Sequence, residues 1–340
     1  MTTSAWHAQP LRIGVLGAAR ITALSLVEPA RITGHRLVAV AARSPERAAA
    51  FAAEHGIERV DQTYADVIAD PEVEAVYNPL PNAMHGRWNA AVAAAGKHLL
   101  TEKPAAANAA EMRAVAEGVR AAGIVWLEGF HYPYHPLFLR VREILASGGV
   151  GRVRHVSAPL WMPSPPDDDP RWSLELAGGA TMDLGCYSIS CLRLLGEYAG
   201  GEPTLVAATA TERPGRPGVD ERLAIKVEYP SGATGSGGSD MAYAGRNFTL
   251  TVTGTTGQVE CPMFAVPSED DSLVWRRDGH DAVVEHLGRP TSYTYQLEAF
   301  AAAVRSGAPV VTDVDFSMAT MTLVDAAYVM AGMEPRSPGD

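Results

Sequence analysis

Short apolar runs alternate with longer amphipathic or alanine-rich stretches along the first third of the chain. Short runs rich in Val, Leu and Ile indicate buried strands, and the longer stretches between them indicate helices. Two helix starts are clear, because Ser44 precedes Pro45 and Asn108 stands three residues before Glu111. This alternation is typical of a doubly wound parallel sheet. We predict its strands over residues 11–16, 37–42, 75–78, 98–101 and 124–127.

The pattern changes after Phe130. Helices are predicted over residues 137–146 and 180–195, with a strand over 152–161. Residues 162–170 are so rich in Pro and Asp that they predict a loop.

Consecutive strands without helices between them follow over residues 203–286, separated by turn signals such as Pro230-Ser231-Gly232. Such a succession is typical of an antiparallel sheet. Two helices, over 292–305 and 316–331, close the chain, and the tail 334–340 is expected to fray.

The sequence therefore predicts an α/β unit followed by an α+β unit. Residues 9–130 are expected to form a Rossmann doubly wound parallel sheet that binds a dinucleotide. Residues 131–340 are expected to form a substrate-binding and dimerisation domain, whose large open sheet is mostly antiparallel and flanked by helices. A chain of 340 residues is long enough to build two cores.

Composition narrows the class of protein. The net charge is −11 and the basic residues are scattered, which argues against a nucleic-acid surface. No apolar run approaches the ~20 residues of a membrane span, and Met1–Pro10 carries neither the basic nor the apolar region of a signal peptide. The three cysteines form no C-x-x-C pair, so we expect them to be buried thiols in the reducing cytoplasm.

A degenerate dinucleotide fingerprint follows the first predicted strand. Gly17 fills the first position of G-x-G-x-x-G, but Ala19 and Thr22 replace the second and third glycines. The tight turn would present the N–H groups of a helix start, around Arg20 and Ile21, to a pyrophosphate. By itself this signal is weak, because any α/β protein can place a glycine after its first strand.

The end of the second predicted strand indicates which dinucleotide is bound. NAD sites usually place Asp or Glu there, whereas this chain has Arg43 and Ser44, with Arg47 one turn later. A guanidinium and a hydroxyl suit a 2′-phosphate, so NADP(H) is favoured over NAD(H). The alternative is an ordinary helix cap with a solvated arginine.

Three side chains are candidates for catalysis. Lys103 follows the strand at 98–101, where open α/β sheets bind ligands. Asp183 and Tyr187 stand four apart in a predicted helix and so share one face. An ammonium there could stabilise charge on a substrate oxygen and move the phenol pKa toward working pH. The alternatives are a solvated lysine, ordinary helix polarity and a core aromatic.

Four motifs in this order resemble the glucose–fructose oxidoreductase/inositol dehydrogenase (Gfo/Idh/MocA) family over nearly the whole chain. They are the fingerprint at 17–22, Asn78–Asn82 with His85, Glu102-Lys103-Pro104, and Gly178–Tyr187. The chain looks most similar to the branch that holds dihydrodiol and D-xylose dehydrogenases and sugar ketoreductases.

The resemblance implies roles for these residues. Lys103 would face the nicotinamide, Tyr187 would donate or accept the proton, and Asp183 would orient a substrate hydroxyl. Many relatives have histidine in place of Tyr187, so the sequence leaves open whether Tyr187 or Lys103 is the proton donor. The implied cofactor contacts are Gly17, Ala19, Arg20, Ile21, Arg43, Ser44, Arg47, Leu80, Pro81, Asn82, His85, Glu102, Lys103, Arg171, Trp172 and Tyr295.

The expected function is that of an NADP-dependent oxidoreductase acting on an aldose, a ketosugar or a cyclic trans-diol. The alternatives are a glycosidase or isomerase that retains its nicotinamide, and a non-catalytic dinucleotide sensor. A homodimer or homotetramer is expected, since one face of the antiparallel sheet lacks helices. No metal site is expected, because Pro133 disrupts the helix that would align His131 with His135.

Overall fold

The computed structural model describes residues 9–339, and the first eight residues, on which part of the signal-peptide argument rests, lie outside that range. The N-terminal sheet consists of β1 (Arg12–Leu16), β2 (Arg36–Ala41), β3 (Ala75–Asn78), β4 (His98–Thr101) and β5 (Trp126–Glu128). Its order is β2-β1-β3-β4-β5, and every neighbouring pair is parallel. The predicted doubly wound sheet is confirmed, with strand ends shifted by at most two residues.

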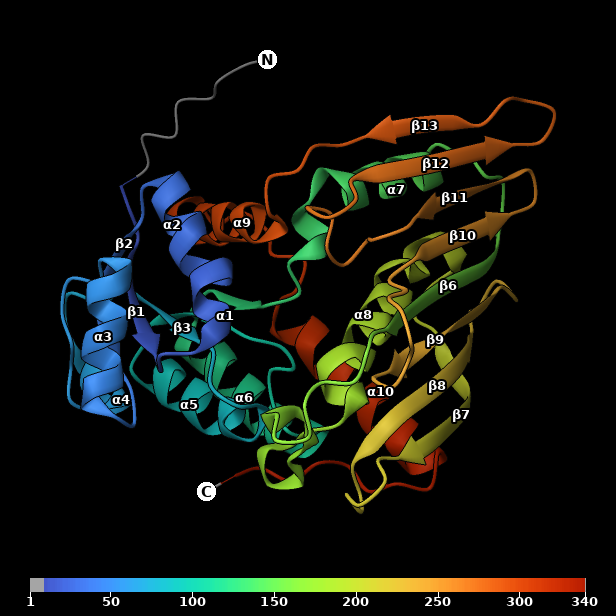
Figure 1. Cartoon of the computed structure of the whole chain (residues 1–340). Helices are drawn as coiled ribbons and strands as arrows, with labels where there is room; N and C mark the ends of the chain where they lie inside the picture. The colour runs from blue at the N-terminus through green and yellow to red at the C-terminus, as the bar shows by residue number, and fades with distance from the viewer. Residues whose placement is uncertain (1–8, 340) are drawn as a thin grey trace.

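Helices cover both faces of this sheet (Figure 1). They are α1 (Arg20–Thr22), which continues through a π-helical turn (Ala23–Val27) into α2 (Glu28–Thr33), then α3 (Pro45–His55), α4 (Tyr64–Ala69), α5 (Asn82–Ala94) and α6 (Ala109–Ala122). The predicted caps are present: Ser44 accepts the N–H of Arg47, and Asn108 accepts the N–H of Glu111. These caps begin α3 and α6 at the carboxyl side of the sheet, where a ligand would bind.

The second sheet has eight strands in the order β13-β12-β11-β10-β6-β9-β8-β7. Only β6 and β9 pair in parallel, so the predicted mostly antiparallel sheet is confirmed. Its strands are β6 (Val153–Trp161), β7 (Thr204–Glu212), β8 (Asp220–Glu228), β9 (Thr234–Asp240), β10 (Leu250–Gly254), β11 (Gly257–Cys261), β12 (Ser272–Arg277) and β13 (Val283–His286).

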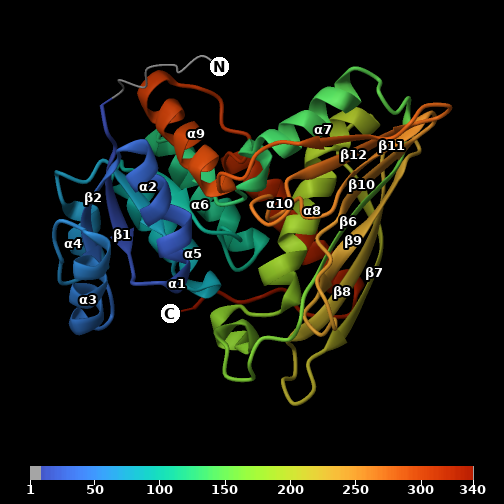
Figure 2. The same ribbon diagram turned by 45° about the horizontal axis from the view of Figure 1, so that its top comes forward.

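Helices lie on one face of the second sheet only (Figure 2). The helix α8 (Cys186–Leu194), which continues a π-helical segment at Thr181–Gly185, packs against β6 and β9, and α10 (Val314–Met330) packs against β7 and α6. The remaining helix of this unit is α7 (Pro136–Ala146). The opposite face is a shallow groove of small and polar side chains such as Ser157, Pro159, Ala224 and Ser236.

One late helix crosses back to the first sheet. α9 (Ser292–Ser306) lies beside α2 in both views (Figures 1 and 2). Its buried side chains Leu297 and Phe300 join the core made by Leu11, Ile13 and Leu26. These residues belong to the predicted C-terminal unit, but their apolar face completes the core of the N-terminal sheet.

The expected fraying of the tail is wrong for residues 334–339. Arg336 is 2% exposed, and the N–H of Gly339 donates to the carbonyl of Ala83 at 2.8 Å. Buried polar contacts therefore hold the end of the chain.

Within residues 9–339, no helix combines the length and the hydropathy that crossing a bilayer would need.

Candidate active site

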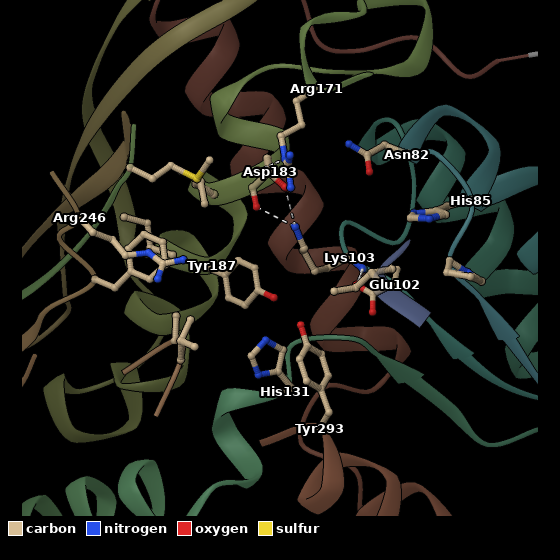
Figure 3. A pocket seen from close by; sticks show the side chains of 18 of the residues that line it. Asn82, His85, Glu102, Lys103, His131, Arg171, Asp183, Tyr187, Arg246 and Tyr293 are labelled. Carbon is tan, nitrogen blue, oxygen red and sulfur yellow. Dashed lines mark hydrogen bonds and ion pairs between the residues drawn. The ribbon is translucent and has the colours of Figure 1, made fainter. Parts of the chain in front are cut away.

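A cavity of about 340 Å³ lies where the carboxyl ends of β3 and β4 face the second sheet. Ile21, Leu80 and Lys103 line it from the Rossmann side, and Asp183, in the π-helical segment before α8, and Tyr187, in α8, line it from the other side. Since ligands of open α/β sheets bind outside the carboxyl ends of the strands, its position is that of a substrate and cofactor cleft. The three predicted catalytic residues therefore meet in one cavity (Figure 3).

Asp183 is held between two cations. Its Oδ1 lies 3.2 Å from the Nζ of Lys103, and its Oδ2 lies 2.7 Å from the Nε of Arg171. The Nζ of Lys103 also donates to the main-chain carbonyl of Asp183 at 2.8 Å. Burial alone would raise the pKa of Asp183, but Lys103 and Arg171 outweigh it and hold the pKa below its ordinary value.

Lys103 keeps its proton for the reciprocal reason. Burial alone would lower its pKa, but the charge of Asp183, with Cys186 and Glu102, outweighs burial and raises the pKa above its ordinary value. The site therefore presents a carboxylate and an ammonium together near neutral pH.

Tyr187 is a neutral phenol in this site. Its ring centroid lies 5.0 Å from the Nζ of Lys103, a cation–π geometry. Burial first, and then neighbouring Tyr293 and Glu102, raise the pKa of Tyr187 well above its ordinary value. The expectation that the ammonium would lower this pKa is wrong, because Lys103 lies over the face of the ring and desolvation dominates.

Two further aromatic residues surround the phenol. Tyr293, from the start of α9, points its hydroxyl toward that of Tyr187, and His131 lies beside both rings (Figure 3). The His131 ring stacks on Tyr293 at a centroid distance of 3.9 Å and shares a hydrogen bond with Ser292 at 2.7 Å. Burial lowers the pKa of His131 to about 3. A neutral imidazole therefore stands beside the two phenols.

Glu102 lies behind Lys103 and does not pair with its ammonium. The hydroxyl of Tyr77 donates to Oε1 of Glu102 at 2.8 Å, and the same hydroxyl shares a hydrogen bond with Ser25 at 2.5 Å. Ser25 in turn donates to the carbonyl of Ile21, beside the glycine turn. This buried chain connects the turn after β1 with the Glu-Lys-Pro segment after β4.

The loop after β3 forms the edge of the same cavity. Leu80, Asn82 and His85 line it, and Pro81 is the residue before α5. The Nδ2 of Asn82 donates to the carbonyl of Ala177 across the cleft at 3.2 Å. His85 is held by the carbonyl of Pro104 at 2.7 Å, and burial lowers the pKa of its imidazole to about 4.

The turn after β1 fits a dinucleotide. Gly17 has φ +97°, and a Cβ there would lie 3.0 Å from the side chain of Leu80, so glycine is required. In the described structure Ala19 provides no side-chain cap for the helix that begins at Arg20, so the N-cap side chain does not compete with a phosphate there. Arg20 is exposed at this helix start and lies 3.5 Å from Asp169 of the facing loop.

The end of β2 also fits the predicted 2′-phosphate site. Arg43 and Arg47 are exposed, and the Nη2 of Arg47 donates to the carbonyl of Ala18 in the glycine turn. Ser44 caps α3, which is the role predicted for it as the alternative to binding a 2′-phosphate. Its hydroxyl also donates to Glu46 at 2.7 Å. The described residues thus place the guanidinium of Arg47 beside the turn and an exposed Arg43 at the end of β2.

Trp172 and Tyr295, which the family resemblance implied as contacts of the cofactor, do not line the cavity. Trp172 is 1% exposed and packs under the guanidinium of Arg213, with its indole N–H donated to Pro165. Tyr295 packs edge-on against His135, whereas Tyr293, two residues earlier, lines the cavity. His131, which the sequence suggested only as a metal ligand and then excluded, also lines the cavity, and so does Arg246, which no sequence pattern indicated and which lies between β9 and β10.

Two family models match the chain. Residues 11–130 match an oxidoreductase family with an NAD-binding Rossmann fold, and residues 138–260 match the GFO/IDH/MocA C-terminal domain. Fold and site together thus define an oxidoreductase with a Rossmann domain.

Several similar proteins cover most of this chain. A D-xylose 1-dehydrogenase (NADP(+)) of Haloferax volcanii is 37% identical over 94% of this chain and 97% of its own. A trans-1,2-dihydrobenzene-1,2-diol dehydrogenase of Bos taurus is 31% identical over 74% of this chain and 73% of its own. The crystal structure of a 3-ketoreductase from Actinomadura kijaniata, solved with NADP and TDP-benzene, has a TM-score of 0.85 at 27% identity and covers 94% of this chain and 97% of that one. The chain belongs to the Gfo/Idh/MocA oxidoreductase family.

No group of three or more His, Cys, Asp or Glu side chains that could hold a metal ion occurs among residues 9–339.

Proposed function

We propose that this protein is an NADP-dependent oxidoreductase that transfers a hydride between the nicotinamide and a sugar-like alcohol or carbonyl. The observation that carries the proposal is the cluster of Lys103, Asp183 and Tyr187 in the cavity beside the Rossmann sheet. When bound, the nicotinamide supplies or takes up the hydride. The protein's own residues bind, orient and protonate the substrate.

Each of the three residues has a separate task. Asp183, kept ionised by its two cations, accepts a hydrogen bond from a substrate hydroxyl next to the reacting carbon. The ammonium of Lys103 stabilises negative charge that develops on the carbonyl oxygen. Tyr187, which its raised pKa keeps protonated, holds a proton on its Oη and donates it to that oxygen during reduction. We therefore assign the donation of the proton to Tyr187 and the stabilisation of the negative charge on the substrate oxygen to Lys103.

The arginines at the glycine turn and at β2 support NADP(H) as the cofactor. A 2′-phosphate would meet Arg43 and Ser44 where an NAD site would offer a carboxylate. The xylose dehydrogenase relative is named for NADP(+), and the 3-ketoreductase was solved with NADP.

The substrate class that we propose comprises aldoses, ketosugars and cyclic trans-diols. The names of the relatives support it, as do the paired charges at the cavity, where Asp183 pairs with Lys103 and Arg171 and the guanidinium of Arg246 pairs with Glu269. We further propose that the protein is a homodimer or homotetramer that acts in the cytoplasm. The helix-free sheet face and the three buried free thiols support this assignment.

The test is a panel of substrates in which the absorbance of NADPH measures turnover. D-Xylose, other aldoses, ketosugars, inositols and trans-diols are offered with NADP⁺ and with NAD⁺, and the Lys103→Ala variant serves as the inactive control. We expect turnover of at least one polyol with stoichiometric NADPH formation, and a preference for NADP⁺ that narrows in Arg43→Ala. Product without net change in NADPH would indicate the isomerase or glycosidase alternative. Tight NADPH binding without turnover on any compound would indicate a sensor.

A further inference from the structure

The last described residues of the chain form a C-terminal strap, residues 334–339, that ends in a buried ion pair. The Nη2 of Arg336 lies 2.5 Å from Oδ1 of Asp220, and the two side chains are 1% and 0% exposed. The Nε of Arg336 donates to the carbonyl of Gly178 at 2.7 Å. A Cβ on Gly179 would lie 2.0 Å from the same carboxylate, so the Gly-Gly pair lets the ion pair approach the main chain.

The other oxygen of Asp220 holds the start of the catalytic helix. It accepts the N–H of Thr181 at 2.7 Å and the hydroxyl of Thr181 at 2.6 Å. The residue before that helix, Ala180, provides no side-chain cap. A carboxylate at a helix start satisfies a free N–H and interacts favourably with the helix dipole. Thr181 stands only two residues before Asp183, so the position of Asp183 follows from this contact.

The strap also contacts the Rossmann side of the cleft. Its Arg336 carbonyl accepts the Nδ2 of Asn108, the residue that caps α6, at 2.7 Å. Its Gly339 N–H donates to the carbonyl of Ala83, next to the cavity-lining Asn82. The strap thus connects the start of the helix that carries Asp183 and Tyr187 with the two helix starts nearest to Lys103.

We propose that Arg336 and Asp220 are positioning residues, through which the strap sets the distance and angle between the Asp183–Tyr187 helix and Lys103. The proposal rests on the catalytic roles assigned above. A contribution to stability alone is a poor explanation of the pair, because a buried ion pair commonly stabilises no better than apolar residues of the same volume. Two bonds of Asp220 are instead directed at the start of the helix that carries Asp183, while a third accepts the hydroxyl of Tyr328 in α10 at 2.9 Å.

The first test is the Arg336→Lys variant, which keeps the charge and loses the planar fork that bonds Asp220 and Gly178 together. We expect kcat to fall by about 10- to 100-fold, the scale of a small misplacement of reacting groups. The Kd for NADPH should change less than about threefold, since most of the implied cofactor contacts lie in the Rossmann unit. Ser337→Ala, an exposed neighbour in the strap, is the matched control and should match the wild type.

A second variant keeps the proposal testable if Arg336→Lys does not fold. Asn108→Asp preserves the helix cap, because Asp caps as well as Asn, but it removes the donor to the strap. It should lower kcat in the same direction by a smaller factor.

Hydrogen exchange supplies a readout that does not depend on activity. Amides of residues 178–187 should exchange faster in both variants than in the wild type, while those of β10 and β11 should not change. Unchanged exchange of residues 178–187 in the two variants would overturn the proposal. Unchanged kinetics in a variant whose Tm has fallen would also overturn it. Failure of the wild type on the whole substrate panel would overturn the proposed function instead, and exchange would still test the strap.

Discussion

The chemistry of this site depends on how burial and nearby charges set the protonation state of each titratable side chain. Asp183 and Lys103 stabilise each other's charged forms, whereas Tyr187 and His131 are kept neutral by burial. The site therefore holds a carboxylate between two cations, a proton on the phenol of Tyr187 and an uncharged imidazole at His131. That distribution suits the donation of a proton to a reduced carbonyl better than its removal from an alcohol.

The catalytic roles predict how single and double variants behave. Lys103→Ala and Tyr187→Phe should each lower kcat by about 10²-fold or more, the scale of general acid–base catalysis. Tyr187→Phe keeps the ring over which Lys103 lies, so the Kd for NADPH should change little. Because the two groups act in one step, the double variant should be only slightly worse than the worse single one. Near-normal turnover in Tyr187→Phe would leave Lys103 as the proton source.

His131 predicts a dependence of stability on pH. Its folded pKa, about 3, lies below the ordinary value of 6.5, so the unfolded chain binds the proton first as the pH falls. Stability is therefore complete above pH 6.5 and decreases below it, by about 2 kcal/mol at pH 5 from this residue. Urea unfolding at pH 7 and pH 5 would measure the loss. His131→Gln should reduce it, whereas an equal loss in wild type and variant would exclude the assignment. The exposed His280→Gln is the control.

At the scale of elements, the sequence predicted most of what local rules govern. Caps at Ser44 and Asn108, and the apolar runs of the parallel strands, gave ends correct within two residues. The prediction that Tyr295 lies in the cleft depended on the rotation of α9 about its axis. Tyr293 and Tyr295 are two apart in this helix and point in nearly opposite directions, so only Tyr293 lines the cavity. The phase of α9 follows from its packing on the first sheet, which no local pattern reveals.

The tail shows the same limit. Residues 334–339 have the composition of a frayed end, and their order comes from Asp220, more than a hundred residues earlier in the chain. The pairing of Arg336 with Asp220 depends on tertiary geometry, so the sequence contained both charges without indicating that they meet. The cluster at Lys103 could be predicted because a family resemblance added the information that spacing lacked.

At the scale of the whole molecule, the helix-free face of the second sheet predicts self-association. Val206 is 46% exposed on β7, and the groove on the helix-free face combines small side chains with Trp161, Ile225 and Lys226, which a second copy could contact. We expect light scattering at low micromolar concentration to give a dimer or a larger closed assembly. Ala224→Arg, in the middle of that face, should shift the mass toward the monomer. Glu54→Arg on α3 is the control, and a wild type that stays monomeric at high concentration would contradict the prediction.

The packing of α9 on the first sheet has a consequence for synthesis. A ribosome releases the Rossmann strands first, but the helix that covers Leu11, Ile13 and Leu26 is residues 292–306. The core of the N-terminal sheet therefore stays incomplete, with part of its apolar face exposed to water, until most of the chain has been synthesised. Nascent domains in that condition are the ones that chaperones bind and that aggregate when production outpaces folding. A gene cut at residue 130 would release the same unfinished surface permanently.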